Sequence, residues 1–325
     1  MKILITGGLG YIGSHISSKL KSRAIILDNL SNSSLDYKKK LPDATVYIDD
    51  ISIKSLKKIF LQHKIKGVIH LAGFKSVDES ALFPLEYYRN NVVSTLDLLN
   101  CMDQFQINNL IFSSSATVYG SDNKNPLKES YIVNSTNPYG STKIVIENIL
   151  SEYTKSKKNF KAISLRYFNP IGADIKKQLS DQPLGRPQNL MPMIIRSVIE
   201  NKMLTIYGND YCTTDGTCIR DYIHVKDLAD AHILALKKIK KIKNHVIINI
   251  GLGKGVSVYE LIRIFENSNN LKVKYKIGPR RLGDVPISFA DNKFAKNFLN
   301  WKPKFDHKQM CMDSWQSAFY KINNN

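Results

Sequence analysis

Six short apolar runs, each followed by a segment of helical pattern, constrain the fold of this 325-residue sequence more than any other feature. The runs are nearly continuous in apolar residues rather than alternating, which is typical of strands covered by helices on both faces. Strands are expected at 2–6, 24–28, 45–49, 67–72, 109–115 and 161–167, and helices at 11–22, 52–64, 86–105 and 138–158. Repeated βα units of this length predict an α/β protein built on a Rossmann-type doubly wound parallel sheet.

The regular pattern loosens after about residue 168. A loop rich in Pro, Gly and Asn follows, and the elements beyond it are shorter. We expect residues 1–168 to form the domain of the large sheet and residues 169–325 to form mainly a smaller α/β domain. The apolar run at 246–250 is a candidate return to the large sheet.

The formal charge of +19 raises the question of a polyanionic partner. The lysines are scattered rather than interleaved with stacking aromatics, and no zinc-finger or helix-turn-helix spacing occurs, so we expect no nucleic-acid partner. Four distant cysteines suit neither a disulfide framework nor a metal site. No apolar run approaches the ~18 residues of a membrane span and no secretory signal is visible, so we expect a cytoplasmic protein without membrane contact.

A glycine-rich turn follows the first strand and opens the first helix. Gly7, Gly10 and Gly13 form G-x-x-G-x-x-G, a variant of the fingerprint that lets the backbone approach a pyrophosphate at a helix N-terminus. Asp28 ends the second strand, where an acid binds the ribose 2′-hydroxyl and would repel a 2′-phosphate. The turn therefore predicts NAD rather than NADP; the alternative is an ordinary glycine-rich turn.

The stretch "NPYGSTK" places Tyr139 and Lys143 four residues apart behind a proline, so they share one face of a helix. A phenol with an ordinary pKa near 10 is a poor base at neutral pH, but Lys143 and a positive nicotinamide ring would both favour the phenolate. Ser115 ends the fifth strand at the ligand-binding edge and can donate to the same substrate oxygen. Together they predict removal of a proton from a carbinol while its hydride passes to NAD.

Several blocks extend this pattern through nearly the whole chain, among them "ITGGLGYIGSH", "HLAGFKSVDES", "FSSSATVYG", "LRYFNPIGA", "IRDYIHVKDLADAH" and "PRRLGD". With these blocks in this order, the sequence resembles the extended short-chain dehydrogenases/reductases, and specifically the UDP-glucose 4-epimerases. The resemblance implies interconversion of UDP-glucose and UDP-galactose through a transient 4-keto sugar, with Tyr139 as the base, Lys143 as its tuning cation and Ser115 on the reacting hydroxyl.

The resemblance also implies binding residues. Besides the three glycines, Ser115, Tyr139 and Lys143, its NAD contacts fall on Tyr11, Ile12, Asp28, Asn29, Asn32, Ser33, Asp50, Ile51, Leu71, Ala72, Gly73, Lys75, Asn90 and Phe168. Besides Ser115 and Tyr139, its contacts to the UDP-hexose substrate fall on Asn169, Asn189, Leu190, Thr205, Ile206, Tyr207, Arg220, Arg281, Asp284 and Ser288. The family also implies a homodimer, formed through the helices expected at 86–105 and 138–158.

Substrate width depends on Ser288. Members of the family restricted to glucose and galactose carry a tyrosine at this position, whereas members that also accept N-acetylated sugars carry a small residue. Ser288 therefore predicts that UDP-GlcNAc and UDP-GalNAc are substrates too, unless Phe289 or Tyr207 refills the space.

Two other readings stay open. Dehydratases and decarboxylases of the family carry an acidic residue where this chain has Ala116 and Thr117, because their chemistry needs it. A non-catalytic NAD-binding protein could share the fold, although such relatives usually lose the Tyr/Lys pair.

Overall fold

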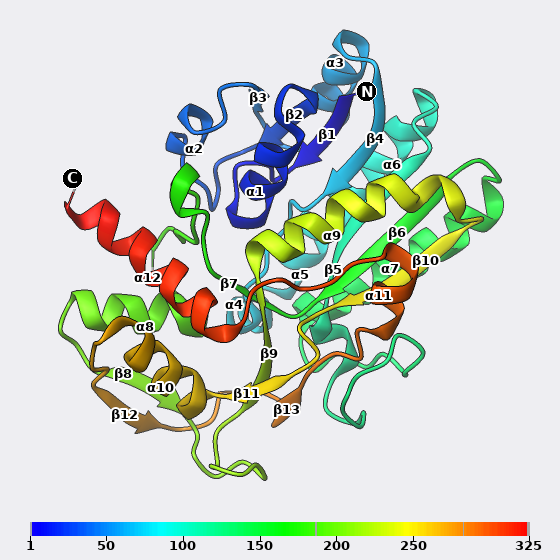
Figure 1. The fold of residues 1–325 in the computed structure, drawn as a ribbon. Coiled ribbons are helices and arrows are strands. Elements are labelled where there is room, and N and C mark those ends of the chain that lie inside the picture. Colours follow the sequence, from blue (N-terminus) through cyan, green and yellow to red (C-terminus); the bar gives the residue numbers. More distant parts are fainter. Residues whose placement is uncertain (1, 186, 282, 324–325) are drawn as a thin grey trace.

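The computed structural model describes residues 2–185, 187–281 and 283–323, and its centre is a parallel sheet (Figure 1). The strand order is β10-β6-β5-β4-β1-β2-β3. The bounds are β1 Lys2–Thr6, β2 Ala24–Asp28, β3 Thr45–Ile48, β4 Ile65–His70, β5 Asn109–Ser115, β6 Lys161–Tyr167 and β10 His245–Ile250. The order reverses between β1 and β4, so a crevice opens at their carboxyl ends. The predicted doubly wound fold is confirmed.

Helices cover both faces of this sheet and create two cores. Ile3 and Ile5 of β1 belong to one core and Leu4 to the other, as the alternation of side chains along a strand requires. The first core is closed by α1 Tyr11–Leu20, α9 Val225–Lys238 and α11 Lys293–Leu299, and the second by α3 Ile53–Gln62, α6 Ser94–Gln104 and α7 Pro138–Ser156. Burial on both faces explains why the strands are apolar at nearly every position.

Short elements connect these units. They are η1 Lys21–Arg23, α2 Asp36–Lys39, α4 Val77–Leu82, α5 Pro84–Tyr88, the π-helix η2 Arg89–Val93, η3 Ala116–Tyr119 and η5 Ile239–Lys241.

The helix expected at 86–105 is present, since α5, η2 and α6 follow one another without a gap, but its segment Arg89–Val93 is π-helical rather than α-helical. Ser94 and Thr95 donate their hydroxyls to the carbonyls of Asn90 and Asn91, four residues earlier, and compete with the backbone there. The Asn91 side chain in turn accepts from the amide of Phe74 at 2.8 Å, beside the crevice. The interruption therefore presents a side chain to the loop after β4, as π-bulges often do at functional sites.

A smaller group of elements lies beyond the carboxyl ends of the large sheet (Figure 1). Strand β9 Ile219–His224 pairs with β7 Asn169–Ile171, β11 Gly255–Ser257 and β13 Ile287–Ser288, while β8 Leu204–Tyr207 pairs with β12 Tyr275–Gly278. Its helices are η4 Ile175–Lys177, α8 Leu190–Ile199, α10 Val258–Asn269 and α12 His307–Asn323. Their apolar faces form a separate core around Phe265, Met310 and Ile194.

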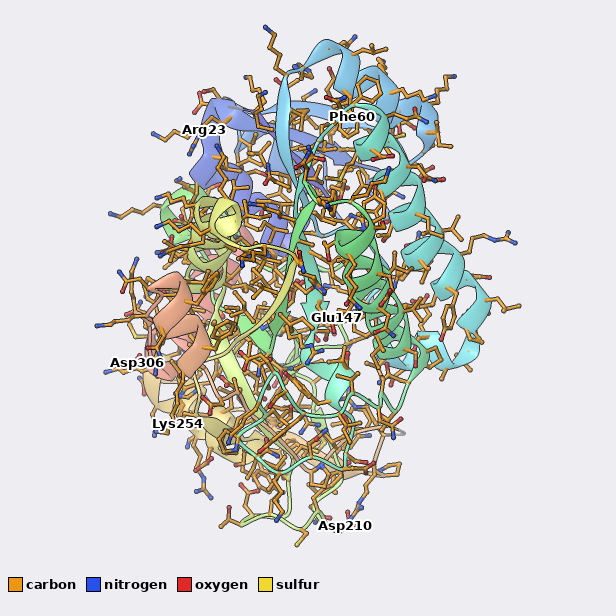
Figure 2. All side chains as sticks on the ribbon, turned by 90° about the vertical axis from the view of Figure 1, so that its right-hand side faces the viewer. Arg23, Phe60, Glu147, Asp210, Lys254 and Asp306 are labelled. Atoms are coloured by element: carbon orange, nitrogen blue, oxygen red, sulfur yellow. The ribbon has the colours of Figure 1, made fainter. Side chains whose placement is uncertain are left out.

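Figure 2 places Phe60 of α3 at one end of the molecule and Asp210, in the loop after β8, at the other. In the part of the chain that the structure describes, no helix combines the length and the apolar character needed to cross a bilayer.

Candidate active site

The glycine turn brings backbone atoms closer together than side chains would allow. Gly7 adopts φ +69°, and a Cβ there would lie 2.9 Å from the amide nitrogen of Ala72 in the loop after β4. A Cβ on Gly13 would lie 2.1 Å from the carbonyl oxygen of Gly7. The first turn of α1 therefore packs directly on the loop that precedes it, and its free amides face the crevice.

Asp28 joins the glycine turn to the loop after β2. Its carboxylate accepts from the backbone amides of Leu9 and Leu30, both at 2.9 Å, and from the hydroxyl of Ser33 at 2.7 Å. A carboxylate has about four acceptor sites, so one remains for a ribose hydroxyl. Asn29 donates to Asp50 at 2.7 Å on the same rim.

A cavity of about 600 Å³ extends from this turn along the carboxyl edge of the sheet. Every residue that the sequence assigned to NAD lines it: Gly7, Gly10, Tyr11, Ile12, Gly13, Asp28, Asn29, Asn32, Ser33, Asp50, Ile51, Leu71, Ala72, Gly73, Lys75, Asn90, Ser115, Tyr139, Lys143 and Phe168. The glycine cradle, the anchored carboxylate and the size of the cavity fit a dinucleotide.

The three candidate catalytic residues come from two neighbouring elements. Ser115 ends β5, and α7 begins at Pro138 and carries Tyr139 and Lys143 one turn apart. All three side chains are buried. The Lys143 ammonium donates to the carbonyl of Ser113 at 2.9 Å and lies 5.6 Å from the centre of the Tyr139 ring.

Local chemistry holds the start of α7 against β5. The Asn137 side chain accepts from the amide of Gly140 at 2.9 Å and caps the helix, while Pro138 occupies its first turn. A Cβ on Gly140 would lie 2.0 Å from the hydroxyl oxygen of Ser135 and 3.0 Å from the carbonyl oxygen of Thr117. The glycine of "NPYGSTK" is therefore what lets Tyr139 approach Ser115.

Burial disfavours the charged forms of both Tyr139 and Lys143. It raises the pKa of Tyr139 above its ordinary value near 10, while the hydrogen bond with Ser115 acts in the opposite direction. It lowers the pKa of Lys143 to about 8, while the charge of Glu147 acts in the opposite direction. Lys143 therefore still carries its proton at neutral pH.

Behind this pair lies a buried ion pair that the sequence analysis missed. Glu147, one helical turn beyond Lys143, accepts from Arg166 of β6 at 2.6 Å and from the hydroxyl of Ser114 at 2.6 Å. Glu147 and Arg166 are 4% and 3% exposed. Through these contacts Glu147 of α7 is tied to both β5 and β6, one helical turn from Lys143 (Figure 2, where Glu147 is labelled).

A second cavity of about 270 Å³ lies between the sheet edge and the smaller group of elements. Of the residues assigned to the UDP-sugar, it is lined by Ser115, Asn169, Asn189, Leu190, Thr205, Ile206, Tyr207, Arg220, Arg281, Asp284 and Ser288; Tyr139 lines the larger cavity instead. Ser115, Thr117, Phe168 and Asn169 line both cavities, so the two meet at the candidate catalytic residues.

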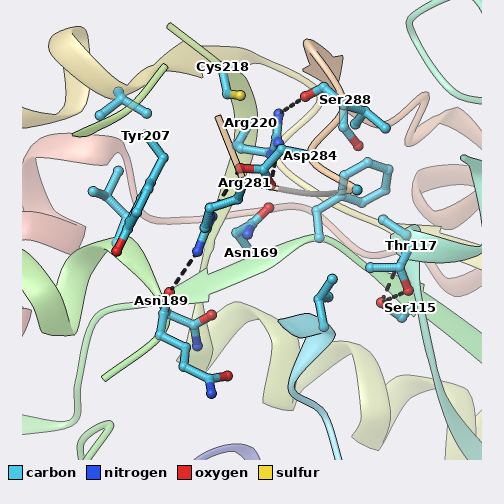
Figure 3. A pocket seen from close by; sticks show the side chains of 18 of the residues that line it. Ser115, Thr117, Asn169, Asn189, Tyr207, Cys218, Arg220, Arg281, Asp284 and Ser288 are labelled. Atoms are coloured by element: carbon cyan, nitrogen blue, oxygen red, sulfur yellow. Dashed lines mark hydrogen bonds and ion pairs between the residues drawn. The ribbon is translucent and has the colours of Figure 1, made fainter. Parts of the chain in front are cut away.

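Two arginines converge on one carboxylate in this second cavity. Asp284 accepts from Arg220 at 3.4 Å and from Arg281 at 3.1 Å, and the Arg281 guanidinium lies 5.0 Å from the centre of the Tyr207 ring. Figure 3 shows this cluster on one side of the cavity and Ser115 with Thr117 on the other. The cluster carries a net positive charge, which suits a diphosphate.

Ser288 is buried in the wall of the same cavity, opposite Arg220 in the pairing of β13 with β9. The ring of Phe289 packs towards Gly255, where an added Cβ would meet it at 3.2 Å. The space beside Ser288 is therefore not refilled by Phe289.

Among the residues that line these cavities without having been assigned there, three bear on the site's chemistry. Thr117 and Tyr167 line both cavities, and Asp181 lines the larger one. The position of Thr117, two residues after Ser115, was a usable signal; Asp181 lies in the loop after η4, where no local pattern marks it. Across residues 2–185, 187–281 and 283–323, no three His, Cys, Asp or Glu side chains are grouped so that they could hold a metal ion.

Comparison with known proteins gives a consistent result. Residues 3–251 match the model of the NAD dependent epimerase/dehydratase family. The chain is 45% identical to the UDP-glucose 4-epimerase of Erwinia amylovora, with 97% of each chain covered. It superposes on the UDP-glucose 4-epimerase of Bifidobacterium longum in complex with NAD⁺ and UDP with a TM-score of 0.95, 36% identity and complete coverage of both chains.

It also superposes on the UDP-Glc/GlcNAc 4-epimerase of Campylobacter jejuni, with a TM-score of 0.84, 34% identity and coverage of 98% of this chain and 99% of that one. The glycine cradle, the Ser115–Tyr139–Lys143 group and these similarities agree. The chain therefore belongs to the NAD-dependent epimerase/dehydratase family and, within it, to the UDP-glucose 4-epimerases.

Proposed function

We propose that this protein is an NAD-dependent 4-epimerase that interconverts UDP-glucose and UDP-galactose. The observation that carries the proposal is the meeting of a dinucleotide cavity and an arginine-lined cavity at Ser115, beside Tyr139 and Lys143. Membership of the family supports the same reaction.

In this proposal Tyr139 takes the proton from the sugar 4-hydroxyl and later returns it. Lys143 stabilises the phenolate, and Ser115 donates a hydrogen bond to the reacting oxygen. NAD⁺, when bound, supplies the hydride acceptor and a positive ring charge that favours the phenolate. Burial of Tyr139 and Lys143 excludes water, so the proton stays with the site between the two half-reactions.

The site binds the two ends of the substrate with different strength. Arg220 and Arg281 provide cations for the diphosphate, with Asp284 holding both guanidinium groups in place. The residues at the sugar end, such as Ser115, Asn169 and Ser288, are neutral. A site with a firm hold on UDP and a loose hold on the hexose permits the sugar to turn over between the two steps.

We further propose that the enzyme accepts UDP-GlcNAc and UDP-GalNAc. The small Ser288 leaves room for an acetamido group, and Phe289 packs away from this space. Ser288→Tyr should abolish turnover of the N-acetylated pair and leave that of UDP-glucose and UDP-galactose largely intact. Ser288→Cys is the matched control that keeps a small side chain. Wild-type protein that turns over UDP-galactose but not UDP-GalNAc would refute the pocket argument.

Elimination or decarboxylation is the less favoured chemistry. Those enzymes need an acidic side chain at the position of Thr117, and threonine is not an acid. Asp284 is an acid in the second cavity, but two arginines engage it.

The reaction class is tested with purified protein, the four UDP-sugars and chromatographic separation of the products, without added NAD. Epimerised products from dialysed protein are expected, because the cofactor should copurify. Stoichiometric release of NADH would indicate a dehydrogenase. Loss of water from the sugar would indicate a dehydratase, and loss of CO₂ would indicate a decarboxylase. Bound NAD without turnover of any of the four sugars would indicate a non-catalytic NAD-binding protein.

We propose residues 1–168 as the main NAD-binding part and residues 169–325 as the main UDP-sugar-binding part of a cytoplasmic homodimer that serves galactose metabolism. Exposed apolar side chains on α5, η2 and α6 support a partner surface: Leu85 is 83%, Val93 48% and Leu96 39% exposed. Sedimentation should give a dimer, and Leu85→Glu should weaken it. A monomer at micromolar concentration would argue against the assembly.

A further inference from the structure

Thr117 lines both cavities, and neither the family resemblance nor the spacing of motifs gives it a task. We propose that Thr117 is a positioning residue: it sets the direction of the Ser115 hydroxyl so that Ser115 donates its proton towards Tyr139 and the reacting sugar oxygen. This inference rests on the proposed function, since it assigns a role in the same proton transfer.

Two donors of Thr117 reach the same oxygen. The hydroxyl of Thr117 donates to Ser115 Oγ at 2.9 Å, and its backbone amide donates to the same atom at 3.3 Å (Figure 3). A serine hydroxyl has two acceptor positions and one proton to donate. With both acceptor positions filled by Thr117, Ser115 can enter further contacts only as a donor.

The group on which this donor acts is Tyr139. Burial raises the pKa of Tyr139, and hydrogen bonding by the Ser115 side chain lowers it, so Ser115 favours the ionised phenol. Ser115 is only 8% exposed, so little water competes for its proton. A chain from Thr117 through Ser115 to Tyr139 polarises each successive bond, and the last donor is strengthened.

The turn itself does not need the Thr117 hydroxyl. Ser115 caps the short helix η3 by accepting the amide of residue 117, and any residue other than proline supplies that amide. The side-chain bond is additional. Removing it without changing the shape of the side chain therefore separates positioning of Ser115 from folding of η3.

The test compares Thr117→Val, which keeps shape and amide, with Thr117→Ser, which keeps the hydroxyl. Thr154→Val is the matched control, because Thr154 is a buried threonine on α7 whose hydroxyl donates to a backbone carbonyl, that of Ser151, and it lines neither cavity. Ionisation of Tyr139 is followed in the NAD-loaded protein by tyrosinate absorbance, with Tyr139→Phe as the background. The pH profiles of kcat and KM for UDP-galactose are measured in parallel.

In Thr117→Val the pKa of Tyr139 should rise by about 0.5–1 unit, and kcat at neutral pH should fall about 3- to 10-fold, the effect of one hydrogen bond. KM should stay within about twofold of the wild-type value, because the hydrogen bond from Thr117 acts on Ser115 and not on the bound substrate. Thr117→Ser should restore both values, and Thr154→Val should change neither. If Thr117→Val loses NAD and folds poorly, Thr117→Ala is measured instead, with the same expectation.

An unchanged titration and pH profile in the folded variant would overturn the proposal. A change confined to KM would also overturn it, since Thr117 would then be a direct sugar ligand. Wild-type protein without turnover of any UDP-hexose would refute the proposed function. In that case the absorbance titration, which needs no turnover, still decides whether Thr117 controls Tyr139 through Ser115.

Discussion

Replacing Glu147 by glutamine should destabilise the protein by about 3–5 kcal/mol, the usual cost of removing one partner from a buried ion pair. Glu147 accepts from Arg166 at 2.9, 3.2 and 2.6 Å and from Ser114 at 2.6 Å. Burial lowers the pKa of Arg166, but the hydrogen bonds and the charge of Glu147 outweigh burial. Together they hold the pKa of Arg166 above its ordinary value. Without Glu147 the guanidinium keeps its charge in a site that is 3% exposed. Since total stability is typically about 5–15 kcal/mol, the loss is a large share of it.

The assay is urea denaturation at a fixed concentration of NAD, because ligand binding adds to apparent stability. The midpoint should fall with an unchanged m-value. The matched comparison is Glu147→Leu with Arg166→Met, which removes both charges and should be less destabilised than the sum of the two single variants. Two results would contradict this reasoning. One is a decrease in the free energy of unfolding of less than about 1 kcal/mol for Glu147→Gln; the other is a double variant whose decrease equals the sum of the two single decreases.

The same variant has a kinetic consequence with a defined sign. The negative charge of Glu147 raises the pKa of Lys143, which burial lowers to about 8. Activity should therefore decline as pH rises through about 8 and Lys143 loses its proton, and the decline should begin at lower pH in Glu147→Gln. A decline at the wild-type pH would contradict this coupling.

Two further predictions concern the catalytic face of α7. Tyr139→Phe should keep the fold and bound NAD but reduce kcat by about 10²–10⁴-fold, the range of general base catalysis; retention of more than a tenth of the rate would sink the assignment. Gly140→Ala should lower kcat more than thermal stability, because its Cβ would press on Ser135 and Thr117 and move Tyr139 from Ser115; wild-type kcat would show that the helix start adjusts without consequence.

Several features of this protein are local in the sequence, and these were predictable. A strand covered on both faces must be apolar along its whole length, so β1, β2, β5 and β6 have the bounds read from the sequence. The glycine turn is marked by residues within one βα unit, although Gly7 also packs on Ala72. Tyr139 and Lys143 share a face because helix geometry alone places residues four apart together.

Other features depend on residues distant in the sequence, and only the tertiary structure decided them. The π-helical segment η2 lies where Asn91 reaches back to the loop of Phe74, and the helical pattern of 86–105 gives no sign of it. In the sequence Glu147 is an ordinary helical glutamate. Its partner Arg166 lies on β6, and only the fold brings the two side chains together. Residues 246–250 were only a candidate for a return to the large sheet, and the structure pairs β10 there with β6.

The site shows the same division. Residue types and spacing marked Ser115, Tyr139 and Lys143 as a proton-transfer group, because each chemistry demands that side chain. The effect of burial on the pKa of Tyr139 could not be read from the sequence, since it depends on all the residues packed around the phenol. The two hydrogen bonds from Thr117 to the hydroxyl oxygen of Ser115 depend on the way the chain turns from β5 into η3, which the sequence does not show. A hydrogen bond's direction is a property of atoms in space, and a sequence states only which atoms are available.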